Sequence, residues 1–238
     1  MASRQEEKER RREERLAAER DAEAAAARKK RLGLATAAVL TVALVAVIII
    51  AISASGGGAK KPKPGTGGTS AKLPAAQITD LAAAAKAAGC TVQSFVAGPH
   101  DRDHVAGKVK YKTNPPVFGP HNQTPASDGD YVGQGPPAAE NLLHALEHGR
   151  VLIQYRPGLP KPEVSQLEAV FNEQAGPFTP GQYALVFQND TGMPYAVAAT
   201  AWTQILGCKS FNPKVFDAIR AFRTKYTLKG PELINAPE

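Results

Sequence analysis

A continuous apolar run near the N-terminus, Gly33–Ile52, constrains this chain more than any other feature. The run contains no charged residue. Its length is close to the roughly 20 residues that a helix needs to cross the hydrocarbon core of a membrane. A helix this apolar on all sides does not suit the surface of a soluble domain. The sequence therefore predicts one transmembrane helix over residues 33–52, which makes the lipid bilayer a partner of the chain.

Basic residues on the N-terminal side of this run indicate its orientation. Residues 28–31 are all Arg or Lys, and residues 1–31 hold 11 Lys and Arg against 8 Asp and Glu. Because basic residues prefer the cytoplasmic side, we expect a single-pass protein of the cell membrane with its N-terminus in the cytoplasm and its C-terminal domain outside. A cleaved signal peptide is the alternative, since the small residues Ala51, Ser53, Ala54 and Ser55 could suit a peptidase. Signal peptides, however, have a shorter charged region and a shorter apolar run.

Composition divides the chain into four parts. Residues 1–32 form a charged tail without Gly or Pro, which is expected to be helical. The predicted membrane helix is followed by a linker rich in Gly, Pro and Lys at 53–73, and residues 74–238 have the mixed composition of a globular domain. This domain carries 14 Lys and Arg and 14 Asp and Glu, so the net charge of +7 belongs to the tail and the linker. A neutral domain argues against nucleic acid as a partner.

The predicted outer domain alternates helical and extended patterns. Helices are expected at Thr79–Ala88, Pro137–His148, Glu163–Gln174 and Pro213–Lys225. Strands are expected at Val105–Tyr111, Val151–Tyr155, Tyr183–Gln188 and Tyr195–Thr203. The segment Asn114–Tyr131 is crowded with Pro and Gly and reads as a loop. Together these patterns predict an α+β fold, with a small mixed or antiparallel sheet and packed helices.

The five histidines all lie in one part of the chain, between residues 100 and 148. His144 and His148 are four residues apart in a predicted helix, so both rings project from the same face. Two imidazoles at this spacing can share one metal ion, with a carboxylate as a further ligand. The sequence therefore predicts a metal site formed by His121, His144, His148 and Glu147. His104 and Glu140 are additional candidate ligands.

Three functions are compatible with this cluster. The first is a metal-binding module of the cell envelope that handles copper or zinc. The second is a non-catalytic envelope interaction domain with structural histidines. The third is a zinc hydrolase, because His-x-x-Glu-His at 144–148 matches the order found in one class of zinc peptidases, where Glu147 would activate a zinc-bound water. The sequence has no phosphate-binding glycine loop, nucleophile elbow or dinucleotide fingerprint, and we favour a protein that is not an enzyme.

Three motifs resemble a known family. They are YKTNPPVFGPH at 111–121, GDY at 129–131 and HALEHGRVLIQY at 144–155. With the segment 202–208 and the last predicted helix, they are similar over most of residues 85–236 to the bacterial family catalogued as domain of unknown function 3105. The resemblance implies a membrane anchor, an outer domain and a shared motif that includes His121, His144, Glu147 and His148. The chain departs from the family pattern at residues 117–118, where small hydroxyl residues are frequent, and at Asn122, where an aromatic residue is common.

Cys90 and Cys208 are the two cysteines of the chain. Both lie in the predicted outer domain, and an even number of cysteines outside the cytoplasm favours a disulfide. The alternative is a pair of thiols that joins the histidines as soft ligands, which would favour copper or zinc.

Overall fold

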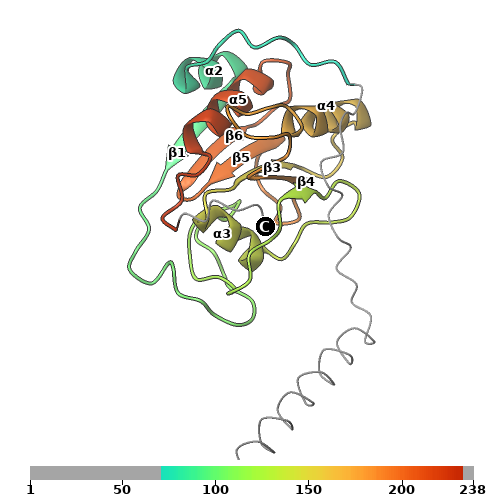
Figure 1. Ribbon diagram of the computed structural model, residues 1–238. Helices are drawn as coiled ribbons and strands as arrows, with labels where there is room; N and C mark the ends of the chain where they lie inside the picture. The colour runs from blue at the N-terminus through green and yellow to red at the C-terminus, as the bar shows by residue number, and fades with distance from the viewer. Residues whose placement is uncertain (1–70, 233–238) are drawn as a thin grey trace, which may run out of the picture. The chain divides into compact units, whose positions relative to one another are not determined.

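The computed structural model describes residues 71–232. The charged tail, the predicted membrane helix at 33–52 and most of the linker lie outside the described residues. Within 71–232, none of the helices combines the length and the apolar character that a membrane span requires. The described residues form four helices and a mixed six-stranded sheet (Figure 1), which confirms the predicted α+β class.

The sheet has the strand order β1-β6-β5-β3-β4-β2. Its strands are β1 (Cys90–Ser94), β2 (Gly129–Asp130), β3 (Val151–Tyr155), β4 (Ala184–Gln188), β5 (Val197–Ala201) and β6 (Gln204–Cys208). The pairs β1–β6, β6–β5 and β5–β3 are antiparallel, whereas β4 is parallel to both β3 and β2. The helices are α2 (Leu81–Ala88), α3 (Ala139–Glu147), α4 (Lys161–Phe171) and α5 (Val215–Tyr226).

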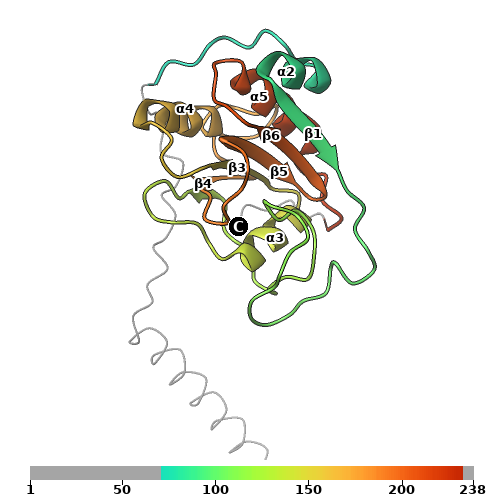
Figure 2. The same cartoon turned by 180° about the vertical axis from the view of Figure 1, so that it is seen from behind.

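Helices cover both faces of this sheet. Side chains along a strand point alternately to the two faces, and β3 follows this rule. Val151 and Ile153 belong to the core cluster that includes residues of α2, α4 and α5. Leu152 belongs to a second cluster with Leu142 and Leu146 of α3. Figures 1 and 2 accordingly show α2, α4 and α5 on one side of the sheet and α3 on the other. All five positions of β3 are buried, as expected for a strand between two layers.

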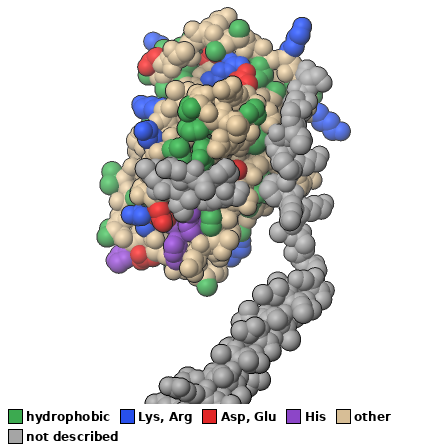
Figure 3. Space-filling model, in the orientation of Figure 1, with side chains coloured by type: hydrophobic (Ala, Val, Ile, Leu, Met, Phe, Trp, Pro, Cys, Tyr) green, Lys and Arg blue, Asp and Glu red, His purple; other side chains and the backbone are tan. Residues whose placement is uncertain are grey.

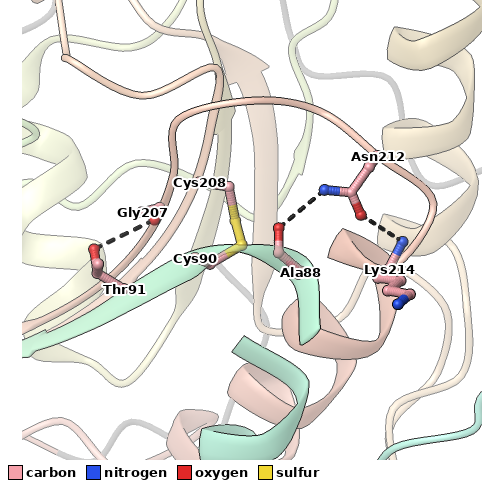
Figure 4. The surroundings of a disulfide bond; sticks show 7 residues. All are labelled: Ala88, Cys90, Thr91, Gly207, Cys208, Asn212 and Lys214. Carbon is pink, nitrogen blue, oxygen red and sulfur yellow. Dashed lines mark hydrogen bonds between the residues drawn. A yellow bond between two sulfur atoms is a disulfide. The ribbon is translucent and has the colours of Figure 1, made fainter. Parts of the chain in front are cut away.

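A disulfide joins the edge strand β1 to β6. Cys90 and Cys208 are register partners in the two antiparallel strands, and their sulfur atoms are bonded (Figure 4). The bridge lies where α2 ends, and there the Asn212 side-chain amide donates a hydrogen bond to the Ala88 carbonyl at 2.9 Å. This confirms the predicted disulfide. It also removes the alternative of two thiol ligands, because both sulfur atoms are bonded to each other.

The predicted strand at Val105–Tyr111 is wrong. This segment has no regular structure, and the Val109 backbone N–H donates to the Glu140 carboxylate at 2.9 Å instead of to a neighbouring strand. The predicted strand Tyr195–Thr203 is shorter than expected, because the chain turns at Thr203, where φ is 60°, and returns as β6. Strands β1, β2 and β6 were not predicted, and the two residues of β2 lie within the segment Asn114–Tyr131 that was expected to be a loop.

The junction between α3 and β3 requires glycine at residue 149. Gly149 has φ of +81°, and a Cβ atom there would lie 2.7 Å from the Leu228 Cα. Gly158 has φ of +83° but nothing within 4 Å of an added Cβ atom. A Gly158→Ala variant therefore measures the cost of the backbone conformation alone, and Gly149→Ala adds the steric clash.

We expect Gly149→Ala to lower the free energy of unfolding by about 2–4 kcal/mol, since a strained φ and overpacking contribute on the order of 1–3 kcal/mol each. Gly158→Ala is expected to cost only about 1 kcal/mol, from the backbone conformation. Thermal unfolding of both variants tests the difference. Equal losses would show that the C-terminal segment at Leu228 yields to the added methyl group.

Candidate metal centre

Two loop segments bind each other beside α3. The His121 backbone N–H donates to the Asp103 carbonyl at 3.0 Å, and the Val105 N–H donates to the His121 carbonyl at 2.8 Å. These bonds form a parallel bridge between His104 and His121. The two imidazole rings therefore lie next to each other, with centroids 5.2 Å apart.

Helix α3 adds two more rings to this pair. The His144 ring centroid lies 4.8 Å from that of His104 and 5.0 Å from that of His121. One turn later, His148 Nε2 lies 2.9 Å from His144 Nε2. His121, His144 and His148 are buried, whereas His104 is exposed. The cluster thus extends from the interior to the surface, and Figure 3 shows histidine side chains gathered on that surface.

Backbone carbonyls indicate which nitrogen carries a proton in two of these rings. His121 Nδ1 lies 2.9 Å from the Gly119 carbonyl, and His144 Nδ1 lies 2.7 Å from the Asn122 carbonyl. A carbonyl oxygen only accepts, so each Nδ1 carries the proton that it donates. Burial lowers the pKa of His144, and the neighbouring His148, His121 and His104 rings lower it further, against the opposing effect of the Asn122 bond. A neutral His144 has its Nε2 lone pair available, which is how metal-binding histidines are commonly oriented.

The contact between His121 and Glu147 is the most informative one in the cluster. His121 Nε2 and Glu147 Oε2 are 2.8 Å apart, and both side chains are buried. The distance alone is that of an ion pair. Among the described residues, however, neither atom has a hydrogen-bond partner, so the two do not approach along the line that a hydrogen bond requires. Two ligands of one ion approach each other in this way, because their lone pairs point to a common centre.

Arg102 holds the other oxygen of the same carboxylate. Its Nε donates to Glu147 Oε1, and its guanidinium lies at the molecular surface, with the side chain 49% exposed. This bond fixes the orientation of Glu147 and leaves Oε2 directed toward the rings. A charged partner behind a carboxylate ligand is the kind of supporting contact that metal sites use.

The structure brings most of the predicted ligands together. One group of side chains has ligand atoms within 4.8 Å of one another, and it comprises His104, His121, His144 and Glu147. A second group comprises His144, His148 and Glu232. The i,i+4 spacing therefore predicted the proximity of His144 and His148 correctly. His148, however, is grouped with Glu232 and not with the predicted ligands His121 and Glu147.

Glu140 lies apart from both groups. Its carboxylate accepts from the Val109 N–H and lies 3.5 Å from Lys108 Nζ. Burial alone would raise the pKa of Glu140, but the backbone hydrogen bonds and Lys108 outweigh it and lower the pKa. Its role in this structure is to bind the irregular segment at 108–109 to α3. His100 is also outside, at the surface beside Asp103.

Sequence reasoning missed two charged residues at the cluster. Arg102 contacts Glu147, and Glu232 forms part of the second group. Arg102 lies two residues before His104, so its proximity could have been inferred from the histidine. No local pattern around Glu232 indicates that the last described residues, 228–232, return to α3.

These observations define an α+β domain with a half-buried histidine–carboxylate cluster that could hold a metal ion. A model of the family described as "Protein of unknown function (DUF3105)" matches residues 104–237, and the chain belongs to this family. The matched part includes all the candidate ligands. Searches of the curated proteins and of the solved structures found no match.

Proposed function

We propose that this domain is a metal-binding module in which His104, His121, His144 and Glu147 hold one divalent ion, zinc or copper. The observation that carries the proposal is the pair of buried, converging atoms His121 Nε2 and Glu147 Oε2, which make no hydrogen bond among the described residues. The four ligand atoms lie within 4.8 Å of one another. The ligands of a tetrahedral zinc ion are about 3.3 Å apart. Small side-chain rotations would therefore bring all four around one ion.

The donor set favours divalent ions. Three imidazoles and a carboxylate suit Zn²⁺ and Cu²⁺, whereas Cu⁺ prefers thiolate and thioether ligands. The two cysteines are bonded to each other and supply no thiolate. Among divalent ions copper binds such sites more tightly than zinc, so the two metals are to be compared in the same titration.

The alternatives explain the geometry less well. Structural histidines would be expected to pair their buried polar atoms, since unpaired ones destabilise a fold. A hydrolase would need Glu147 as the general base, but Arg102 binds one oxygen of this carboxylate and the other faces His121. As a ligand, Glu147 is already well oriented.

We further propose that the module is anchored in the cell membrane by residues 33–52 and lies outside the cytoplasm. The apolar run supports the anchor, and the disulfide supports an oxidising compartment. Thiol trapping in intact cells tests this location, since a cytoplasmic domain would carry free thiols at Cys90 and Cys208.

Metal titration of the full-length chain, purified in detergent without a histidine tag, tests the metal site. We expect one zinc or copper ion per chain. His121→Ala and Glu147→Gln are each expected to weaken binding by at least about 100-fold, because even supporting contacts around a metal contribute 10- to 100-fold. Zinc at 100 times its Kd should also stabilise the wild-type fold by about 2.7 kcal/mol.

His100→Ala is the matched control, since His100 is an exposed histidine near the cluster but outside both ligand groups. It should bind metal like the wild type. If the wild type bound no more metal than His121→Ala while that substitution lowered thermal stability, the histidines would be structural and the proposal would be wrong.

A further inference from the structure

One histidine is common to both ligand groups. His144 belongs to the inner group, defined as His104, His121, His144 and Glu147, and to the outer group, defined as His144, His148 and Glu232. In each group the ligand atoms lie within 4.8 Å of one another. The two groups therefore overlap at a single imidazole ring.

His144 can serve only one ion at a time. Its Nδ1 donates to the Asn122 carbonyl at 2.7 Å, so the Nε2 lone pair is the one available to a metal. His148 Nε2 lies 2.9 Å from this same nitrogen. An ion on His144 Nε2 in the inner group would displace the His148 contact. The two groups are thus alternative positions for one ion and cannot both be complete ligand sets.

The outer group has the weaker set of donors. It has two imidazoles and the Glu232 carboxylate, whose side chain is 45% exposed. The inner group has three imidazoles and the Glu147 carboxylate, whose side chain is 1% exposed. A buried carboxylate with a fixed orientation binds a cation better than a solvated one, because water competes less with the ion. An ion should therefore rest in the inner group.

The position of Glu232 is fixed by its backbone. Its N–H donates to the Glu147 carbonyl at 3.1 Å, and four residues earlier the Leu228 N–H donates to the Gly149 carbonyl at 2.8 Å. Arg102 lies between the two carboxylates, bonded to Glu147 and with Nη2 at 3.9 Å from Glu232 Oε2. The outer group is therefore a built feature at the C-terminal end of α3, where the last described residues return to the helix.

We propose that the outer group is a transfer position, through which the metal ion enters and leaves the inner group. This inference rests on the proposed function. The ion stays on His144 while His148 and Glu232 replace His121, His104 and Glu147 as ligands. Each of the two new ligands displaces one old ligand, and a water takes the place of the third. His148 releases its Nε2 proton to water and takes one up on Nδ1, so the ring stays neutral and the charge of the ion does not change. Zinc accommodates such an exchange because it can expand transiently to five ligands.

The rate of zinc release from the full-length chain tests this proposal. The chain is loaded with one equivalent of zinc and mixed with an excess of a chromogenic chelator, and release is followed by absorbance. Glu232→Gln is expected to slow release by about tenfold or more while changing the equilibrium affinity by less than about threefold. Glu163→Gln, on α4 at the opposite face of the sheet, is the matched control and should release zinc like the wild type.

Several outcomes would overturn the transfer role and leave the metal site intact. Release at the wild-type rate from Glu232→Gln is one. A loss of affinity as large as that of Glu147→Gln would make Glu232 an ordinary ligand of a single site. Two tightly bound zinc ions per chain would show two independent sites. A wild-type chain that binds no zinc would instead overturn the proposed function itself.

Discussion

Replacing both Cys90 and Cys208 with alanine is expected to lower the free energy of unfolding by up to about 4–5 kcal/mol. The bridge closes a loop with a sequence separation of 118 residues, and long loops gain the most in the chain-entropy account of disulfides. The sulfur atoms also lie in the core cluster formed with α2 and α5, so the change removes buried contacts. Thermal unfolding of the full-length chain measures the loss.

The fold predicts where this loss is felt first. β1 is an edge strand and pairs only with β6 among the described strands. Without the disulfide, its attachment to the sheet would depend on hydrogen bonds along one side of the strand. Amides of α2 and β1 should exchange with solvent earlier than those of β3 in the double variant. Reducing agent should destabilise the wild type by a smaller amount, because it opens the bridge but keeps both sulfur atoms, and should leave the double variant unchanged. A wild type that unfolds at the same temperature with and without reductant would contradict the prediction.

Local patterns were sufficient for the central elements of the fold. β3 was predicted with its observed bounds, because the mostly apolar run Val151–Tyr155 comes two residues after Gly149, which was expected to stop the preceding helix. α3, α4 and α5 were predicted at the right places, with ends that differ by a few residues. In each case hydrophobic spacing and the Gly and Pro residues at the ends reflect forces that act within one segment.

Long-range pairing explains the errors. β1 presents mostly exposed positions and becomes a strand because β6 lies beside it. β6 contains Gly207, and a Cβ atom there would lie 2.3 Å from the Tyr195 ring, so the glycine makes room for a side chain that the local sequence does not reveal. The reverse error occurred at Val105–Tyr111, where the residue pattern is typical of a strand but no described strand pairs with the segment. Its Val109 N–H binds Glu140 instead.

In the candidate site, too, the local contacts were predicted correctly and the long-range contacts were not. The i,i+4 rule is a property of one helix, and it placed His144 beside His148. Which loop lies against that helix depends on the whole chain. The sequence therefore indicated His104 only as an additional candidate ligand, although it belongs to the inner group. Glu140, one turn before His144, binds the backbone at Val109 rather than joining the rings. Helical spacing thus identifies neighbours on one face, but the partners of that face come from tertiary structure.

Arg150, which lies between Gly149 and the first residue of β3, carries a buried charge. Its side chain is fully buried, and Nε donates to Asp128 Oδ1 at 3.2 Å. Nη1 donates to the His148 carbonyl at 3.2 Å, and the guanidinium lies 5.2 Å from the centroid of the Tyr183 ring. Asp128 also accepts from the Tyr183 N–H at 3.1 Å. One ion pair therefore connects the end of α3, the segment before β2 and the start of β4.

Arg150→Met is expected to cost about 3–5 kcal/mol, because it breaks a buried ion pair with Asp128 by removing one partner. Asp128→Asn should cost a similar amount, since it removes the same buried ion pair from the side of the carboxylate. Once either charge is gone, removing the other does little further harm, so the double variant should be less destabilised than the sum of the singles. The coupling energy from this double-mutant cycle should exceed about 1 kcal/mol. Losses that simply add would show that the two charges are held by separate contacts. Because neither side chain is in a ligand group, all three variants should still bind one zinc ion below their unfolding temperatures.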